Sequence, residues 1–184
     1  MTCHREPGTA LAKSLKVVQL GVDDFSALRY LHATALKAHT AAVLSQAEVD
    51  AFIALVRSAA YVDLLLKEET YGGFLDGELV GSASWHASGD NGRVARIGSL
   101  FALHPRFGIG RQLLAVIEAR AADCGFSQFA TGVTANAVPF FVRHGYRIAS
   151  RGTRILSAEC GLPVTFLKKT LPRHLRHAPP ATLM

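Results

Sequence analysis

Two closely spaced glycines, Gly108 and Gly110, mark the stretch of this sequence whose residue types point most directly to chemistry. An apolar run over 97–103 comes before them. The residues after them are apolar at the spacing of one helix face, at Leu113, Leu114, Ile117, Ala121 and Cys124. This order predicts a strand, a glycine loop and a helix. Glycines let the backbone approach a ligand closely, and the free N–H groups of a helix start attract anions, so the stretch is a candidate phosphate-binding loop.

The glycine spacing excludes two well-defined nucleotide motifs. No Lys-Ser/Thr pair follows Gly110, as a P-loop requires, and the third glycine of a dinucleotide-binding fingerprint is absent. A Gly-x-Gly before a helix is also compatible with a tight turn that binds nothing. Other segments must therefore decide between a ligand loop and a turn.

The three cysteines, Cys3, Cys124 and Cys160, are an odd number without metal-ligand spacing. They indicate a reducing compartment rather than a disulfide framework. Cys124 would complete the apolar face of the predicted helix, where a cysteine acts as a small hydrophobic residue rather than a nucleophile. We expect no metal site.

The first part of the chain predicts a strand followed by two helices. A strand over 15–20 ends at Gly21, and Asp23 or Asp24 can cap a helix that runs to Lys37. The inner face of this helix includes Leu28, Leu31, Ala35 and Leu36. A capping box from Ser45 to Glu48 begins a second helix, whereas the period of 61–69 fits either a helix end or a strand.

Strand and turn signals dominate the remainder. Asp76-Gly77 predicts a hairpin between strands at 71–75 and 79–87. A third antiparallel strand covers 93–103, and the helix after the glycines ends at Gly125. The last elements are a strand over 126–133, parallel to 93–103, a short helix over 136–145, and strands over 146–151 and 162–171.

This order of elements resembles the GNAT superfamily of acyl-CoA-dependent N-acetyltransferases over about 15–171. Three segments carry the resemblance: Leu100-Phe101-Ala102-Leu103-His104-Pro105, Gly108-Ile109-Gly110-Arg111-Gln112-Leu113-Leu114 and Pro139-Phe140-Phe141-Val142-Arg143-His144-Gly145-Tyr146. It implies an α/β (α+β) fold with a mixed, mostly antiparallel sheet of about six or seven strands and about four flanking helices. It implies a single acetyltransferase domain over 15–171, with a flexible N-terminus at 1–14 and a flexible tail at 172–184.

The resemblance also implies a cofactor site. In the family, the strand matching Phe101, Ala102 and Leu103 is splayed from its neighbour, and its backbone pairs with the pantetheine arm of acetyl-CoA. The loop matching Phe107 to Arg111 wraps the pyrophosphate, and a side chain at Thr134 or Asn136 often adds a contact. The residues expected to bind acetyl-CoA are Phe101, Ala102, Leu103, Arg106, Phe107, Gly108, Ile109, Gly110, Arg111, Thr134 and Asn136.

The sequence departs from the family pattern at four places, one of which is Pro105, where the family usually has a Gln or Arg that can donate a hydrogen bond. Only Arg106 and Phe107 separate Pro105 from Gly108, so the loop is shorter than usual. Phe141 stands where the family often has a tyrosine acid, and the strand over 93–103 has no carboxylate to act as a base. The catalytic residues are therefore not identified by the resemblance.

Histidines are the candidates for a replacement base, because imidazole ordinarily titrates near neutral pH. The candidates are His39, at the end of the first helix, His86 and His104. His86 is expected to share a strand face with Val80, Ser82 and Ser84, with Trp85 on the opposite face in the core. Each histidine also fits an ordinary structural role, and His104 precedes a proline.

Composition limits the class of protein. With 184 residues, 49% hydrophobic and 18% charged, the chain can bury a core and is not disordered. The N-terminus has no apolar core of signal-peptide length and no stretch approaches the length of a membrane span, so we expect a cytoplasmic protein without membrane contact. The sequence also permits a homodimer.

The net charge of +6 is concentrated near the C-terminus. Residues 143–176 contain eight Lys or Arg and one acid. No aromatic platform or recognition helix accompanies this basic end, which makes nucleic acid the weakest of the functional hypotheses. The leading hypothesis is transfer of an acetyl group from acetyl-CoA to a primary amine of a small molecule or protein. The alternative is a catalytically impaired GNAT-like module that binds CoA or a partner.

Overall fold

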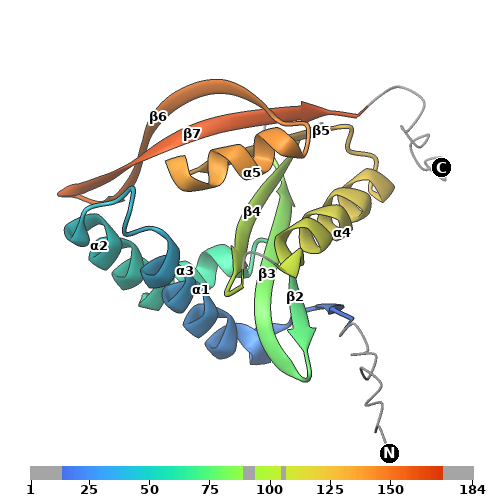
Figure 1. Cartoon of the computed structure of the whole chain (residues 1–184), viewed down its shortest axis with the longest axis horizontal. Helices are drawn as coiled ribbons and strands as arrows, with labels where there is room; N and C mark the ends of the chain where they lie inside the picture. Colours follow the sequence, from blue (N-terminus) through green and yellow to red (C-terminus); the bar gives the residue numbers. More distant parts are fainter. Residues whose placement is uncertain (1–13, 89–93, 105–106, 172–184) are drawn as a thin grey trace, which may run out of the picture.

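The computed structural model describes residues 14–88, 94–104 and 107–171, which form a seven-stranded sheet with helices on both faces (Figure 1). The strands are β1 (Lys16–Gln19), β2 (Glu69–Leu75), β3 (Glu78–Ala87), β4 (Val94–Ala102), β5 (Gln128–Val133), β6 (Arg147–Ser157) and β7 (Cys160–Thr170). The helices are α1 (Phe25–His39), α2 (Gln46–Arg57), α3 (Ala59–Leu65), α4 (Ile109–Asp123) and α5 (Val138–Arg143), with 3-10 turns η1 (Val22–Asp24) and η3 (Ala135–Ala137). Apart from Ser14, the ends predicted to be flexible lie outside the described residues.

The strand order is β1-β2-β3-β4-β5-β7-β6, and all neighbours are antiparallel except β4 and β5. The parallel pair follows from the α4 crossover between these strands, as the sequence predicted. The predicted fold class, a mixed and mostly antiparallel sheet, is confirmed. The additional helix is α3, which occupies the first half of the segment whose period was ambiguous.

Local signals fixed several boundaries. Ser45 Oγ accepts a hydrogen bond from the Glu48 N–H, and the Ser45 N–H donates to the Glu48 carboxylate over 2.7 Å, so the predicted capping box begins α2. At the β2–β3 turn, Asp76 and Gly77 have φ values of 52° and 84°. These positive angles are those of the primed hairpin turn that Asp-Gly predicted.

The last two strands are longer than predicted. Periodicity predicted strands over 146–151 and 162–171, whereas β6 and β7 form one hairpin in which β6 continues to Ser157 and β7 begins at Cys160. Nearly every residue of β6 is exposed, because β6 lies at the sheet edge and pairs only with β7. An edge strand without a buried face has no hydrophobic alternation, so periodicity could not reveal its full length.

Two other predictions about faces were wrong. Cys124 is exposed, because α4 ends at Asp123 and the chain leaves the helix there, turning at Gly125 with φ 90°. Val80 packs with the α4-side core, away from Ser82, because it is the extra residue of a bulge at which the β2–β3 register shifts. Trp85 is buried in the core, as predicted.

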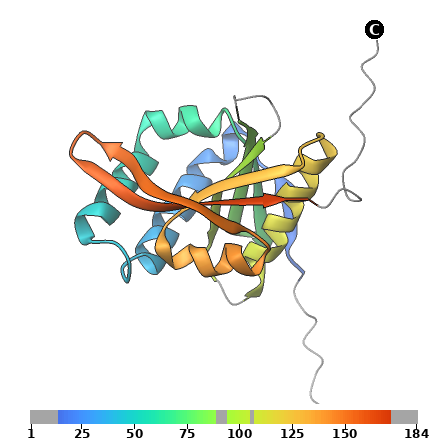
Figure 2. The ribbon, with the colours of Figure 1, turned by 90° about the horizontal axis from the view of Figure 1, so that it is seen from above.

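Two hydrophobic cores lie on opposite faces of the sheet. One joins α1, α2 and α3 to residues in the first half of β7, including Leu162 and Val164. The other joins α4 and α5 to the opposite sheet face. Seen from above, the β6–β7 hairpin extends past the rest of the sheet over the side of α2 (Figure 2). Within the described residues, no helix is both long enough and apolar enough to cross a bilayer.

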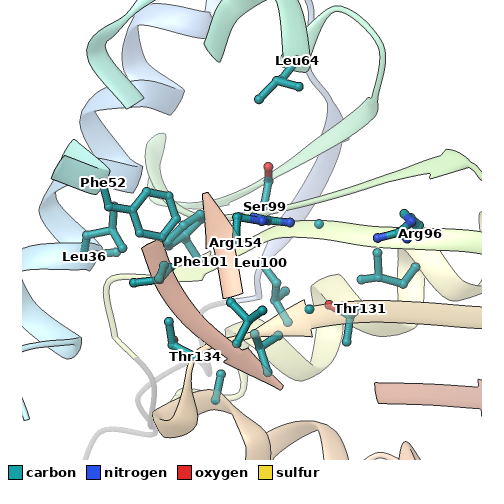
Figure 3. A pocket seen from close by; sticks show the side chains of 18 of the residues that line it. Leu36, Phe52, Leu64, Arg96, Ser99, Leu100, Phe101, Thr131, Thr134 and Arg154 are labelled. Atoms are coloured by element: carbon teal, nitrogen blue, oxygen red, sulfur yellow. The ribbon is translucent and has the colours of Figure 1, made fainter. Parts of the chain in front are cut away.

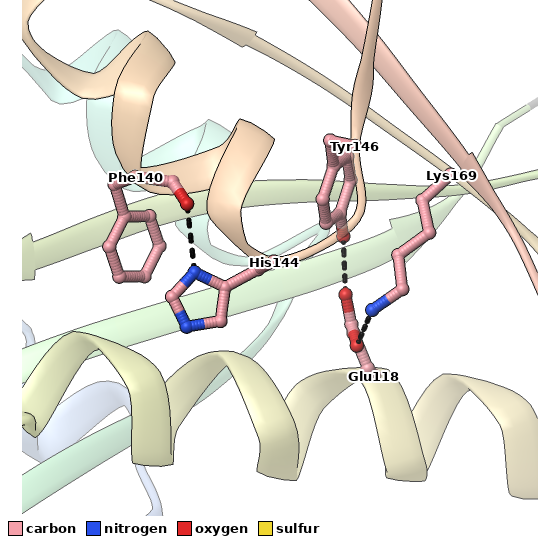
Figure 4. A network of polar contacts seen from close by, with 5 residues as sticks. All are labelled: Glu118, Phe140, His144, Tyr146 and Lys169. Atoms are coloured by element: carbon pink, nitrogen blue, oxygen red, sulfur yellow. Dashed lines mark hydrogen bonds and ion pairs between the residues drawn. The ribbon is translucent and has the colours of Figure 1, made fainter.

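A polar network fixes α4 against the end of the sheet (Figure 4). Glu118 of α4 accepts hydrogen bonds from the Tyr146 hydroxyl over 2.8 Å and from Lys169 of β7 over 2.5 Å. Burial is the main reason that the pKa of Tyr146 is raised, with the neighbouring Glu118 carboxylate acting in the same direction. The tyrosine therefore stays a neutral donor that holds α4 in place.

Candidate active site

A cavity of about 700 Å³ opens between β4 and β5 and continues under α1, α2 and α3 (Figure 3). Strands β4 and β5 pair only over 94–96 and 128–130. Beyond these residues they separate, and Gly98 to Ala102 and Ala130 to Thr134 line the cavity from its two sides. The separation of these strands is the feature that the family resemblance implied.

The first turn of α4 offers unpaired backbone donors. Gly108 precedes α4 with a left-handed φ of 71°, a conformation that favours glycine. The first hydrogen bond closing this helix runs from the Gln112 N–H to the Gly108 carbonyl over 3.1 Å. The N–H groups of Ile109, Gly110 and Arg111 therefore have no partner within the helix, and their binding of an anion stays a prediction.

The structure divides the predicted cofactor residues into two groups. Phe101, Ala102, Thr134 and Asn136 line the cavity, whereas Leu103, Phe107, Gly108, Ile109, Gly110 and Arg111 do not. The second group extends from the end of β4 into α4, and the Ile109 side chain is buried, so only its backbone is available to a ligand. Arg106 lies outside the described residues.

The polar groups of Thr134 and Asn136 already have partners. The Thr134 hydroxyl donates to the Asn136 side-chain oxygen over 2.6 Å, and the Asn136 amide donates to the His39 carbonyl over 3.0 Å. These bonds join the end of β5 and η3 to the end of α1, and all three residues line the cavity. A cofactor contact by either side chain stays a prediction.

A carboxylate that the sequence analysis missed lies beside His86 in the cavity wall. Glu68, in the turn before β2, places Oε1 3.4 Å from His86 Nδ1. Its other oxygen, Oε2, accepts a hydrogen bond from the Ser84 hydroxyl over 2.5 Å and a longer one from the Ser99 hydroxyl over 3.4 Å. The His86 side chain keeps 35% of its surface exposed, so one ring nitrogen faces the carboxylate while the ring remains accessible.

Glu68 is held in its ionised form. Burial alone would raise the pKa of this carboxyl, but the close approach of His86 Nδ1 and the hydrogen bond from Ser84 outweigh burial and lower it. An ionised carboxylate beside Nδ1 favours the tautomer in which this nitrogen carries a proton, which leaves Nε2 free to accept one. This pairing orients His86 as an acceptor of protons.

The other two candidate histidines are differently placed. His39 lines the cavity, but its Nε2–H donates to the Leu103 carbonyl over 3.2 Å, at the end of β4. His104 is exposed and does not line the cavity. Its ring lies edge-on to the ring of Phe107, with the ring centroids 6.0 Å apart. Among the described residues, His86 is the histidine of the cavity that faces a carboxylate.

Phe141 lines the cavity and is buried, so no proton donor occupies the position at which the family often has tyrosine. A different tyrosine, Tyr61 of α3, does reach the cavity wall. Its hydroxyl lies 2.8 Å from Nδ1 of His32, and burial raises the pKa of Tyr61 to about 12. Tyr61 is thus a neutral hydrogen-bond donor.

His32 is fully buried and is the centre of a hydrogen-bond chain that could not be read from the sequence. Its Nε2 lies 2.8 Å from the Ser82 hydroxyl, which donates to the Ser99 carbonyl over 2.8 Å. Because this hydroxyl has one proton to give, His32 Nε2 must be the donor and Nδ1 the acceptor. Burial lowers the pKa of His32 to about 3, so the ring is neutral.

The buried chain ends where β4 is most irregular. Ser99 has a positive φ of 45°, which is uncommon for a residue other than glycine. The β3–β4 register shifts at the same place, between Ser82 and Ser84. The bond to the Ser99 carbonyl therefore holds a bulge in the strand that borders the cavity.

Similarity to known proteins agrees with this geometry. Residues 37–146 match the model of the Acetyltransferase (GNAT) family. This match covers more than half of the chain, so the chain belongs to the GNAT acetyltransferase family, a class of acyltransferases.

Individual relatives support the same assignment. The chain is 36% identical over 90 residues to the Uncharacterized N-acetyltransferase YjcF of Bacillus subtilis, an alignment that covers 48% of this chain and 64% of that relative. A GCN5-related N-acetyltransferase structure from Rhodopseudomonas palustris superposes with a TM-score of 0.76 at 22% identity, covering 89% of this chain and all of that one.

Two further solved structures share the fold and contain a ligand. PaiA N-acetyltransferase from Thermoplasma acidophilum, in complex with coenzyme A, has a TM-score of 0.63 at 16% identity and covers 85% of this chain and 99% of its own. YncA, a putative acetyltransferase from Salmonella typhimurium with its cofactor acetyl-CoA, has a TM-score of 0.60 at 20% identity. This match covers 92% of the present chain and 99% of YncA. Within the described part of this chain, no three His, Cys, Asp or Glu side chains gather as a metal site would need.

Proposed function

We propose that this protein transfers an acetyl group from acetyl-CoA to a primary amine in a ternary complex. The observation that carries the proposal is the opening between β4 and β5, with the Glu68–His86 pair in the wall of the cavity it leads to. Membership of the GNAT family and the CoA-containing structural relatives support acetyl-CoA as the donor.

The residues present fit such a donor at both of its ends. The first N–H groups of α4 have no acceptor within the helix, so they are available to donate hydrogen bonds to a pyrophosphate. The edge of β4 at Phe101 and Ala102, which has no β5 partner, offers backbone groups to an extended amide-containing arm. When bound, acetyl-CoA supplies the thioester carbonyl that an amine attacks, and the C–N bond forms as the C–S bond breaks.

His86 is the group that we assign to the proton of the amine. As the nitrogen attacks, Nε2 of His86 accepts that proton, while Glu68 stabilises the resulting imidazolium through Nδ1. Phe141 has no proton for the departing sulfur. The sulfur leaves as a thiolate, which is a sufficiently stable leaving group to take its proton from water. Arg106, Thr134 and Asn136 remain predicted cofactor contacts.

The test compares binding with turnover. Calorimetric titration with acetyl-CoA, free CoA and ATP measures whether the site prefers the thioester donor. Release of the CoA thiol is then followed with a panel of amines. Thiol release that requires both acetyl-CoA and an amine supports the proposal. Tight CoA binding without thiol release for any amine would instead support the impaired CoA-binding module.

A variant of Gly110 tests whether the start of α4 binds the phosphates of CoA. A Cβ at this position would lie 3.5 Å from the Phe140 ring, so Gly110→Val fits the helix but adds methyl groups beside the first-turn N–H groups. We expect at least about a tenfold loss of CoA affinity with an unchanged melting temperature, because the methyl groups exclude the phosphate from its donors. Gly21→Val, at an extended position with open space around it, is the matched control and should bind CoA normally. Unchanged affinity of the Gly110 variant would contradict phosphate binding at the start of α4.

A further inference from the structure

Two arginines line the same cavity, and the family resemblance did not implicate either of them. Arg96 of β4 and Arg154 of β6 both border it (Figure 3), and neither forms an ion pair with any described residue. Among the described residues of the lining, Glu68 is the one carboxylate, and its oxygens are directed at Ser84 and His86. The cavity therefore carries positive charge that the protein itself does not neutralise.

Both arginines lie on the acceptor side of the sheet. Arg96 pairs in register with His86 across β3 and β4. Its neighbours along the strand, Ala95 and Ile97, are buried in the α4-side core, so Arg96 faces the opposite side. Arg154 lies on the β6–β7 hairpin, opposite Leu162 of the core formed with α1, α2 and α3. A phosphate held at the start of α4 would lie on the other face.

Apolar side chains form another part of the acceptor side. Its wall includes Phe52, Leu55, Leu64 and Ile155. Both arginines are solvent-exposed, and their two guanidinium groups on the same side of the cavity repel a second cationic group on the acceptor and attract an anion. Guanidinium groups bind carboxylate and phosphate oxygens with paired hydrogen bonds.

From this arrangement we propose that the acceptor is a small molecule that carries a primary amine and a carboxylate or phosphate. Arg154 and Arg96 bind the anionic end, and the amine lies at His86. This assignment rests on the proposed acetyl transfer and names its substrate class. The cavity of about 700 Å³ must hold the thioester end of the donor as well as the acceptor, which favours a small molecule over the surface of a folded protein.

The test uses pairs of amines that differ only in the anionic group. One series compares ω-amino carboxylates of increasing length with their primary amides, and a second compares aminoalkyl phosphates with the corresponding amino alcohols. We expect kcat/KM to be at least about tenfold higher for the anionic member, since charge-assisted hydrogen bonds are among the strongest available. The better series distinguishes carboxylate from phosphate. Equal or faster transfer to the neutral members would overturn the proposal.

Variants of the arginines show whether these groups are responsible. Arg154→Gln should raise KM for the preferred anionic amine by about tenfold or more and leave KM for its neutral partner and for acetyl-CoA unchanged. Arg96→Gln should act in the same direction. Arg151→Gln, on the same strand but outside the cavity lining, is the matched control and should behave as wild type. An Arg154 variant that retains the anion preference, together with an Arg96 variant that retains it, would refute the assignment.

Direct binding separates failure of this assignment from failure of the enzymatic proposal. The anionic and neutral amines are titrated calorimetrically into the protein saturated with CoA, so that no acetyl transfer is required. Anion-selective binding that is lost in Arg154→Gln would support the anion site even if no thiol were released from acetyl-CoA. Binding without anion selectivity would overturn it, whether or not acetyl transfer occurs.

Discussion

Two hydrogen-bonded networks start from serines of strand β3. They contain similar residue types but differ in their access to solvent. Ser82 connects the strand to His32 and Tyr61, and Ser84, two residues further along, connects it to Glu68 and therefore to His86. We call the first group the closed chain and the second the open pair. Both link a serine of β3 to a histidine, directly or through Glu68, and both approach Ser99 of β4.

Burial separates the roles of these two groups. His32 is completely buried, has both ring nitrogens committed to hydrogen bonds and stays neutral. His86 has one nitrogen directed at a carboxylate and a ring that remains partly exposed. The closed chain can fix the shape of β4 but cannot exchange protons with an acceptor. The open pair has the access that proton transfer requires.

The largest effect that we expect is on catalysis, and it concerns the open pair. His86→Gln should lower kcat by about three orders of magnitude, the middle of the range for general base catalysis, and flatten the acidic limb of the pH–rate profile. KM for acetyl-CoA should not change. Glu68→Gln, which keeps the imidazole but removes the charge beside it, should lower kcat less, by about tenfold.

Steady-state rates over a range of pH measure both variants. A His86 variant with the wild-type profile would remove this residue from the mechanism. Equal losses in the two variants would show instead that the pair acts as a unit, in which the carboxylate is as necessary as the base.

The second effect is on stability and concerns the closed chain. His32→Leu keeps most of the buried volume but leaves the hydroxyls of Tyr61 and Ser82 without their partner. We expect a loss of about 3 kcal/mol in the free energy of unfolding, because buried polar groups lose their hydrogen bonds. Urea unfolding monitored by circular dichroism measures the loss. His86→Gln, at a partly exposed position, should cost less than about 1 kcal/mol, and a reversed order would contradict the division into closed and open groups.

The sequence could predict the features that arise from local pattern. The strand, glycine turn and helix follow from periodicity and from the backbone freedom of Gly108 and Gly125, and the structure confirms them over 94–104 and 107–125. These residues lie close in sequence, so local rules decide their arrangement. The extent of β6 could not be predicted, since an exposed edge strand carries no such pattern.

The polar groups of the site required tertiary information. Glu68 lies in a segment of ambiguous period, and it reaches Ser84 and Ser99 only because β2, β3 and β4 pair in one register. A signal for His32 did exist in the sequence: it follows Leu31 and comes four residues after Leu28 on the inner face of α1. A polar residue on an apolar helix face implies a buried partner, although its identity depends on the strands that pack there.

The smallest effect is a difference in pH dependence between the two histidines. The pKa of His32 falls from its ordinary value of 6.5 to about 3 in the folded protein. Between these values the unfolded chain binds a proton at this residue and the folded protein does not. The stability associated with neutral His32 is therefore fully present above about pH 6.5 and decreases as the pH falls toward 3. Linkage predicts a loss of about 2 kcal/mol from this group between about pH 7 and about pH 5.

Urea unfolding of wild type and His32→Leu at the two pH values isolates this contribution, because all other titrating groups are common to both proteins. The leucine variant should lose about 2 kcal/mol less than wild type over this interval. His86→Gln should retain the wild-type contribution of His32, since the open pair does not include it. If wild type and the leucine variant lost the same stability, His32 would be able to bind protons in the folded state. The closed chain would then be open to solvent, and the distinction between a histidine that shapes β4 and one that exchanges protons would fail.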